Sequence, residues 1–422
     1  MRFLVVGGGG REHALIWKLS QSPKVTKIYC APGNGGTGDL AQNVSIQADD
    51  IEGLLKFALD EQIDWTIVGP EIPLMLGLTD KFRQQGLKAF GPSQKAAEIE
   101  GSKALAKELM FKYGIPTAQS EAFVDSKAAI DYINKTGAPC VVKADGLAAG
   151  KGVVVAMDVA TAIAAVEMIM QDKVFGESGN KVIIEEFLEG EEVSILAFTD
   201  GQSILPMVSA QDHKRAYDGD EGPNTGGMGA YSPALIYTKE IANKVQQTIL
   251  EPTIKGLAAE GRAYTGVIYA GLMLTVEGPK VLEYNARFGD PETQPVLMRL
   301  ETDLVEVIEA IDKQELHLLS LKWSPAATVC VVMAAGGYPG EYGKGDAITG
   351  LDKVALEDSA VYVFQAGTKK EKGQLVTDGG RVLGVTARGK DIKAAVASAY
   401  KAVEKINFSK KQYRKDIAYK AL

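Results

Sequence analysis

The stretch VLEYNARFGDPETQ, residues 281–294, organises the reading of the whole chain. Its first half alternates as a β-strand does, so Glu283, Asn285 and Arg287 are predicted to share one face. A carboxylate, an amide oxygen and a guanidinium on one face indicate a site for a hard cation beside a fixed positive charge. Mg²⁺ takes oxygen ligands and completes its shell with water and phosphate oxygens. The alternative is an edge strand with a solvated polar face.

The composition is that of an ordinary globular protein. The 422 residues include 46% hydrophobic and 24% charged side chains, enough for about two to four domains. The net charge of −8 disfavours nucleic acid or an anionic membrane as a partner. The one basic cluster, at 410–415, is predicted to be a solvated helix face. Cys30, Cys140 and Cys330 match no disulfide or metal pattern, which indicates a reducing, cytoplasmic compartment.

The N-terminus combines a strand, a glycine turn and a helix. FLVVG at 3–7 precedes Gly8–Gly10, and a helical pattern runs from Ala14. Such a corner presents backbone N–H groups to an anion. A dinucleotide fingerprint needs its third glycine where Glu12 and His13 stand, so a nicotinamide cofactor is disfavoured. The corner is predicted to bind a small phosphate or carboxylate, with a purely structural turn as the alternative.

Strand and helix patterns alternate through the first hundred residues. Strands at 27–30 and 65–68 alternate with helices at 51–62 and 74–85, which predicts an open, mostly parallel sheet. Gly69-Pro70-Glu71 follows a strand at its carboxyl end, where such sheets bind ligands.

A small-residue loop lies in VVKADGLAAGKGVVV, residues 141–155. Lys143 ends the strand before it, and a β-rich run follows it, so the loop is no P-loop. A hairpin of this kind can lie over phosphates while lysines neutralise their charge. Lys103, near a predicted helix start, is another candidate phosphate contact. The loop residues concerned are Gly146, Gly150, Lys151 and Gly152. An ordinary glycine-bearing hairpin is the alternative.

An acidic segment, KVIIEEFLEGEEVSILAFTD, spans 181–200. Its extended backbone can offer C=O and N–H groups to an adenine edge, and a carboxylate a few residues on can accept ribose hydroxyls. The alternative is a solvated strand end. The residues concerned are Glu185, Glu186, Phe187, Leu188, Glu191 and Glu192.

The order of two lysines, glycine flap, acidic segment and Glu-x-Asn pair resembles the ATP-grasp superfamily. Two further stretches narrow the resemblance: VVGGGGREHAL at 5–15 and QDHKRAYDGDEGPNTGGMGAYSP at 211–233. Together with residues 281–294 they resemble the phosphoribosylamine–glycine ligases, also called glycinamide ribonucleotide synthetases. The resemblance covers essentially the whole chain.

The resemblance implies an α/β and α+β multidomain fold. An N-terminal open parallel α/β sheet would occupy 1–101. An ATP-grasp domain would occupy 102–325, with a flap subdomain at about 118–190, and a small C-terminal α+β domain 326–422. The implied reaction joins glycine to 5-phosphoribosylamine at the expense of ATP, through glycyl phosphate, in purine biosynthesis. Mg²⁺ or Mn²⁺ is the implied metal. The implied partners are small molecules only, with the chain a monomer or weak homo-oligomer.

The resemblance also implies a role for individual residues. Lys103 and Lys143 would contact ATP phosphates under a flap at 146–152. Glu186 and Leu188 would meet adenine through backbone, with Glu192, or else Glu191, on ribose. Glu283 and Asn285 would hold the metal, and Arg287 would stabilise the transferring phosphoryl group. Residues implied to shape the pocket for glycine and the amine are Gly8, Gly9, Gly10, Asp212, His213, Lys214, Arg215, Asn224, Thr225, Gly226, Gly227, Met228, Gly289, Asp290, Pro291 and Glu292.

One departure concerns the strand before the Glu-x-Asn pair. Many ATP-grasp enzymes carry another metal-binding acid there, whereas GVIYAGLML at 266–274 has none, and the equivalent position is roughly Ala270. The alternatives are another ATP-grasp ligase or carboxylase of purine metabolism, a nicotinamide dehydrogenase and a catalytically dead nucleotide-binding regulator.

The C-terminal hundred residues predict strands at 326–335, 361–366, 373–377 and 382–387. Gly379-Gly380 is predicted to be a hairpin turn, and a last helix is predicted at 392–406.

Overall fold

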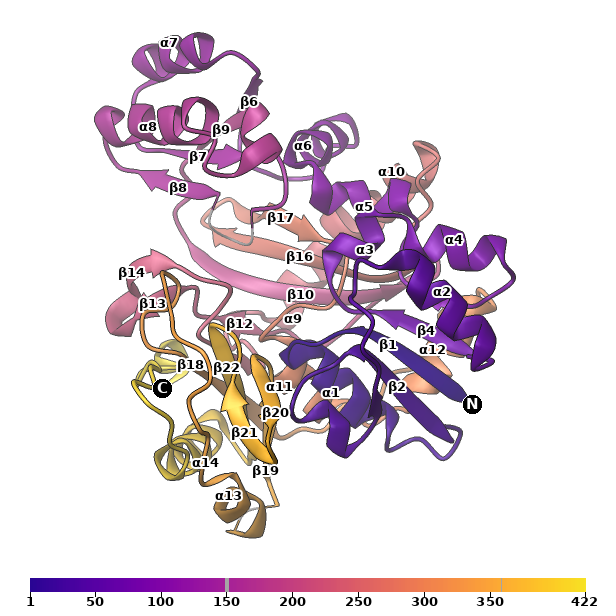
Figure 1. Ribbon diagram of the computed structural model, residues 1–422. Coiled ribbons are helices and arrows are strands. Elements are labelled where there is room, and N and C mark those ends of the chain that lie inside the picture. Colours follow the sequence, from indigo (N-terminus) through magenta and orange to yellow (C-terminus); the bar gives the residue numbers. More distant parts are fainter. Residues whose placement is uncertain (149–151, 358) are drawn as a thin grey trace.

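The computed structural model describes residues 1–148, 152–357 and 359–422. Its first hundred residues form a parallel sheet in the order β3-β2-β1-β4-β5 (Figure 1). The strands are β1 (Arg2–Gly7), β2 (Lys27–Pro32), β3 (Gln42–Asn43), β4 (Trp65–Val68) and β5 (Ala89–Phe90). The helices are α1 (Gly10–Leu19), α2 (Ile51–Asp60), α3 (Glu71–Met75) and α4 (Leu78–Gln84). The prediction of one helix at 74–85 is wrong, because Gly77 takes a left-handed φ of 79° and separates α3 from α4.

Two helices lead into the flap subdomain, α5 (Gln94–Gly101) and α6 (Lys103–Lys112). The flap sheet is antiparallel, in the order β6-β9-β7-β8, and α7 and α8 cover its outer face (Figure 1). The elements are β6 (Ser120–Phe123), α7 (Ser126–Thr136), β7 (Cys140–Ala144), β8 (Val153–Ala156), α8 (Val159–Val166) and β9 (Val182–Glu186). Val142, Ile184 and Ile133 belong to a hydrophobic core of the flap alone.

A second antiparallel sheet, in the order β11-β10-β16-β17, faces the flap sheet (Figure 1). Its strands are β10 (Glu191–Thr199), β11 (Ile204–Pro206), β16 (Gly266–Thr275) and β17 (Gly278–Asn285), and α9 (Lys239–Val245) and α10 (Glu251–Ala259) lie between β11 and β16 in the chain. One core joins this sheet to the N-terminal sheet, since Leu4 and Val6 share it with Ile195 and Val281. The N-terminal and central sheets therefore pack as one body.

The C-terminal sheet contains strands from two distant parts of the chain. Its order is β12-β15-β18-β22-β19, all antiparallel. The elements are β12 (Gln211–Asp212), β15 (Gly229–Ser232), β18 (Ala327–Ala334), α13 (Leu351–Glu357), β19 (Val361–Gln365), β22 (Arg381–Gly389) and α14 (Ile392–Lys405). A hairpin of β13 (Arg215–Tyr217) and β14 (Glu221–Asn224) connects β12 to β15, and α11 (Thr293–Arg299) and α12 (Leu304–Asp312) precede β18 in the chain. Residues 211–232 thus fold against a domain that begins a hundred residues later.

Two predictions for the C-terminal region are wrong. The hairpin turn lies at Lys372–Gly373, between β20 (Thr368–Glu371) and β21 (Gln374–Thr377), and not at Gly379-Gly380. Gly379 instead packs on Gly367, where a Cβ would lie 2.5 Å from the opposing Cα. The basic cluster is no solvated helix face, because Arg414 is fully buried. Among the described residues, no helix has the length and apolar character needed to cross a membrane.

Candidate active site

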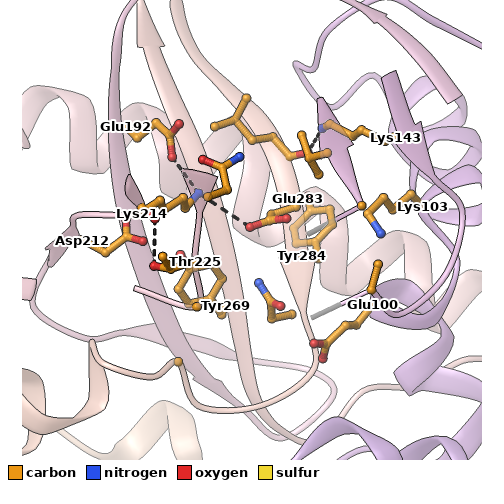
Figure 2. A pocket seen from close by; sticks show the side chains of 18 of the residues that line it. Glu100, Lys103, Lys143, Glu192, Asp212, Lys214, Thr225, Tyr269, Glu283 and Tyr284 are labelled. Carbon is orange, nitrogen blue, oxygen red and sulfur yellow. Dashed lines mark hydrogen bonds and ion pairs between the residues drawn. The ribbon is translucent and has the colours of Figure 1, made fainter. Parts of the chain in front are cut away.

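A cavity of about 730 Å³ lies where the flap sheet, the central sheet and both terminal domains meet. Figure 2 shows Lys103 and Lys143 on one side of it, Glu192, Lys214 and Asp212 on the other, and Glu283 between them. Lining residues therefore come from every part of the chain.

The pleat of β17 sets the floor of the cavity. Glu283 and Asn285 lie on its cavity face, as the alternation predicts, and Arg287 follows just beyond the strand end. Across the ladder, Glu283 is paired with Gly271 and Asn285 with Tyr269. Ala270 is paired with Tyr284, which places it on the opposite face, in the core. The residue that lies opposite Glu283 on the cavity face is Gly271. The assignment of this position to Ala270 is therefore wrong by one residue, because neighbouring residues of a strand lie on opposite faces.

The candidate metal site offers two protein oxygens. Glu283 supplies a carboxylate, and Asn285 supplies an amide oxygen that also accepts a hydrogen bond from Arg287 Nη2 at 3.1 Å. Within the described ranges, no three His, Cys, Asp or Glu side chains are placed together to hold a metal. Two oxygens fit Mg²⁺ or Mn²⁺ with phosphate and water completing the shell, and do not fit a zinc site of His and Cys.

The two predicted phosphate lysines converge on the cavity from different elements. Lys103, at the start of α6, donates to the carbonyl of Gly146 at 2.8 Å, and burial lowers its pKa. Lys143, at the end of β7, pairs with Glu185 at 3.0 Å and donates to Leu282 O at 3.1 Å. The second contact joins the flap sheet to β17.

Lys107 is a cavity residue that the sequence analysis missed. It pairs with Glu185 at 3.3 Å and donates to Thr117 Oγ1 at 2.8 Å. Burial lowers its pKa to about 8, although Glu185 opposes the shift. Glu185 is itself buried between Lys107 and Lys143, so its side chain holds lysines in place. The sequence signal available for Lys107 was its spacing of four residues from Lys103.

Apolar walls from two sheets enclose one end of the cavity. Val141 and Val155 are paired in the flap sheet, and Leu282 stands on β17. Beyond Glu186 the chain leaves β9, so Phe187, Leu188 and Gly190 border the cavity outside any strand. An apolar slot beside a backbone segment that is not paired in a sheet suits a flat heterocyclic base.

The opposite end of the cavity is dominated by Lys214. Its Nζ lies 2.6 Å from Glu192 and 3.8 Å from Glu283. Burial works against its charge, but Glu192, Asp212 and Glu283 together raise the pKa of Lys214 well above its ordinary value. The pKa of Asp212 is raised to about 7 by burial, with Lys214 opposing the shift and Glu292 adding to it.

Several predicted pocket residues do not line the cavity: Gly8, Gly9, Gly10, His213, Gly227, Met228 and Pro291. In the glycine corner, Gly9 N donates to Glu12 Oε2 at 2.5 Å and Arg11 N donates to Asp290 Oδ2 at 3.3 Å. Carboxylates of the protein itself therefore occupy these amides, where the sequence predicts a ligand anion. Gly150 and Lys151 lie outside the described residues.

His213 is a structural residue in this arrangement. Its Nε2 accepts a hydrogen bond from Ala418 N at 2.9 Å, and burial lowers its pKa. The ring thus binds the C-terminal tail and does not face the cavity.

The remaining predicted residues do border the cavity, with Arg215, Asn224, Thr225 and Gly226 on one wall and Gly289, Asp290 and Glu292 on another. Glu292 Oε1 accepts from Tyr269 Oη at 3.1 Å and from Ser194 Oγ at 3.3 Å. The sequence analysis missed several lining residues from both terminal domains, which are Arg11, Glu71, Glu100, Tyr338, Tyr342, Arg381 and Lys420. Of these, Glu71 belongs to Gly69-Pro70-Glu71, the segment that the sequence analysis placed at a ligand-binding strand end without giving Glu71 a role.

Three family models match successive parts of the chain. The N domain of phosphoribosylglycinamide synthetase matches residues 1–100, its ATP-grasp (A) domain 101–293 and its C domain 328–420. Curated relatives named phosphoribosylamine–glycine ligase match end to end. The protein of Allochromatium vinosum is 53% identical over 425 residues, covering 100% of this chain and 99% of its own length. That of Vibrio vulnificus is 52% identical over 426 residues, with the same coverage.

Solved structures agree with the sequence matches. A phosphoribosylamine–glycine ligase from Thermotoga maritima superposes with a TM-score of 0.86 at 33% identity, covering 99% of this chain and 100% of that one. A biotin carboxylase from Campylobacter jejuni superposes with a TM-score of 0.74 at 14% identity, covering 98% of this chain and 92% of that one. The second match shows a shared fold alone.

Proposed function

The chain belongs to the phosphoribosylglycinamide synthetase family, and from this premise we propose how its residues carry the family reaction. It is an ATP-grasp ligase of purine biosynthesis, which joins glycine to 5-phosphoribosylamine and forms glycinamide ribonucleotide, ADP and phosphate. The observation that supports the residue roles is the convergence of Lys103, Lys143, Glu283, Asn285 and Arg287 on one cavity.

The chemistry needs little covalent help from the protein. A carboxylate is a poor electrophile, so the γ-phosphoryl group of ATP is first transferred to glycine, forming glycyl phosphate. The amine of phosphoribosylamine then attacks the acyl carbon, and phosphate leaves. Positioning and charge neutralisation supply most of the rate.

Each end of the cavity has its own part in this scheme. The base of ATP occupies the slot between Val141, Val155 and Leu282, with its edge against the backbone of 187–190. Its phosphates lie along Lys143 and Lys103 toward Glu283. Glycine and the amine occupy the end that is lined by Lys214, Asp212 and the loop at 224–226.

A divalent metal, Mg²⁺ or Mn²⁺, would be held by Glu283 and Asn285 and would neutralise phosphate charge. Lys103 and Lys143 bind the phosphates directly. Lys143 lies on β7 of the flap sheet, and its contact with Leu282 holds the flap sheet against the central sheet. This closed arrangement excludes water from an acyl phosphate. We assign His213 no role as a base, because its ring binds the C-terminal tail.

Phosphate release from ATP tests the proposal. Glycine and freshly made phosphoribosylamine are added with Mg²⁺, first together and then singly. Release that requires both, and that alanine does not support in place of glycine, is the expected result. Release with glycine alone indicates leakage of glycyl phosphate to water. No release under any combination, with ATP bound, contradicts the proposal.

A further inference from the structure

Arg287 is surrounded by groups from three separate elements. Its Nε lies 3.2 Å from Glu71 Oε2, and its Nη2 lies 2.8 Å from Glu100 Oε1. Nη2 also donates to Asn285 Oδ1 at 3.1 Å, and Nη1 donates to Phe288 O at 3.3 Å. Three of the five N–H groups of a guanidinium thus donate to protein acceptors, one each at Nε, Nη1 and Nη2. Nη2 is also held by the ion pair with Glu100, so Nη1 is the nitrogen least occupied by protein.

Glu100 connects the guanidinium to the strand that carries the metal site. While Oε1 pairs with Arg287, Oε2 accepts a hydrogen bond from Ala286 N at 2.7 Å. One carboxylate therefore fixes both the side chain of Arg287 and the backbone between Asn285 and Arg287.

The placement of Glu100 is unfavourable for stability alone. It lies in the last turn of α5, where the helix dipole disfavours a negative charge. Its side chain is only 6% exposed, and burial raises its pKa even though Arg287 opposes the shift. A carboxylate kept in such a position is compensated by the bonds to Arg287 and Ala286.

Glu71 extends the arrangement into the N-terminal domain. Its Oε2 lies 3.2 Å from Arg287 Nε and 3.5 Å from Arg11 Nη2. Arg11 Nη1 also donates to Phe288 O at 3.2 Å, so both arginines meet at one carbonyl. All four charged side chains border the cavity.

We propose that Glu100, supported by Glu71, is a positioning residue that turns the Arg287 guanidinium so that Nη1 faces the transferring phosphoryl group. This inference rests on the proposed role of Arg287 in the reaction. Glu71 pairs with Nε and Glu100 with Nη2, which fixes the plane of the guanidinium. In this orientation Nη1 is directed toward the cavity. A fixed donor helps the transition state without reorganisation at the moment of transfer.

The test is a double-mutant cycle on kcat with the full chain. Glu100→Gln keeps an acceptor for Ala286 N but loses the charge that holds Arg287. We expect kcat to fall by about tenfold or more, with KM for ATP changed by less than about twofold. The double variant with Arg287→Lys should be no slower than Arg287→Lys alone, because Glu100 acts through Arg287.

Glu98→Gln is the matched control. Glu98 lies on the same helix and pairs with Arg262 at 2.6 Å, away from the cavity. Its variant should keep wild-type kcat and KM. Equal kcat in the Glu100→Gln and Glu98→Gln variants would overturn the inference, as would multiplicative effects of Glu100→Gln and Arg287→Lys.

A second variant tests the inference if Glu100→Gln does not fold. Glu71 is 24% exposed at the cavity, so Glu71→Gln is tolerated more easily by the fold and should show the same split, with kcat reduced and KM for ATP kept. A wild-type kcat in this variant, if Glu100→Gln does not fold, overturns the inference. Wild-type phosphate release is measured first, since no release under any combination of glycine and the amine, with ATP bound, refutes the proposed function instead.

Discussion

Glu283 lies at the centre of a ring of cations. Burial alone would raise its pKa, but Lys214, Lys143, Lys103 and Arg287 lower it, so the carboxylate is ionised in the folded protein. It is thereby ready to bind a metal and to balance the charge of the lysines.

We predict that Glu283→Ala abolishes turnover while the fold survives. The variant loses the carboxylate that we propose as a metal ligand and leaves the surrounding cations unbalanced. Phosphate release measures the activity, and thermal unfolding checks the fold. Activity within about threefold of wild type, about 0.7 kcal/mol of barrier, contradicts the metal assignment.

Arg287→Lys is predicted to lower kcat more than it alters ATP affinity. Lysine keeps the charge but lacks the planar fork that bonds Glu71, Glu100 and Asn285 together. Steady-state kinetics with ATP as the varied substrate separates the two effects. A wild-type kcat in this variant means that Arg287 does not stabilise the phosphoryl group.

Asp212 makes stability depend on pH in an unusual direction for an aspartate. Its pKa is raised from 3.8 to about 7 by burial, so ionisation between these values favours the unfolded chain. Its contribution to stability is present below about pH 4 and is lost as the pH rises through 7.

Asp212→Asn should therefore become more stable relative to wild type as the pH rises from 4 to 8. The amide keeps the shape of the side chain and carries no charge that could be buried. Urea unfolding of both proteins at pH 5 and pH 8 measures the difference. A stability difference between the two proteins that stays constant with pH shows that burial does not raise the pKa of Asp212.

At the scale of elements, the N-terminus of α6 is tied to the flap. Asp145 follows β7 and accepts from Ala104 N at 2.8 Å and from Ser102 Oγ at 3.2 Å. The next residue, Gly146, accepts from Lys103. Ser102 is the N-cap of α6, and Asp145 adds a second acceptor that ties the first turn of the helix, with Lys103, to the end of β7.

We predict that Asp145→Ala costs about 1 kcal/mol of stability and also raises KM for ATP. The loss of the acceptor for Ala104 N and Ser102 Oγ loosens the first turn of α6 and with it Lys103. Asp158→Ala is the control, because Asp158 caps α8 by accepting from Thr161 N at 2.8 Å, away from the cavity. It should lose similar stability at unchanged KM. Equal KM values for the two variants contradict the coupling.

At the scale of the whole molecule, the C-terminal tail reaches the cavity. Arg414 is fully buried and pairs with Asp220 at 2.7 Å and Asp416 at 2.8 Å. Lys420 pairs with Asp220 at 3.0 Å and lines the cavity. The tail therefore fastens the β13–β14 hairpin to the C-terminal domain.

Arg414→Met is predicted to destabilise the protein by about 3–5 kcal/mol, because it removes the cation that pairs with both Asp416 and Asp220 and leaves Asp220 with Lys420 alone as a cationic partner. Lys415→Met, an exposed neighbour in the same basic cluster, should change stability by less than about 0.5 kcal/mol. Chemical unfolding of both variants gives the comparison. Similar unfolding free energies for the two would mean that the buried pairs do not hold the tail.

Local patterns predicted some of these features and not others. The alternation in 281–287 was enough to place Glu283 and Asn285 on one face, because the pleat sets orientation within a strand. It could not identify Gly271 as the residue opposite Glu283, because that depends on register with another strand. The same limit explains the wrong prediction of a hairpin turn at Gly379-Gly380. Two glycines are typical of a turn, but here Gly379 packs closely against Gly367.

The sequence by itself determined the chemistry that is local in the chain: the Glu-x-Asn strand, the lysines at element ends and the parallel N-terminal sheet. Only the tertiary structure decided which distant groups meet. Glu100 and Ala286 are 186 residues apart, and Arg414 and Asp220 are 194 apart. Propensity and periodicity act over a few residues, whereas these contacts depend on sheet register and domain packing, which no local pattern encodes.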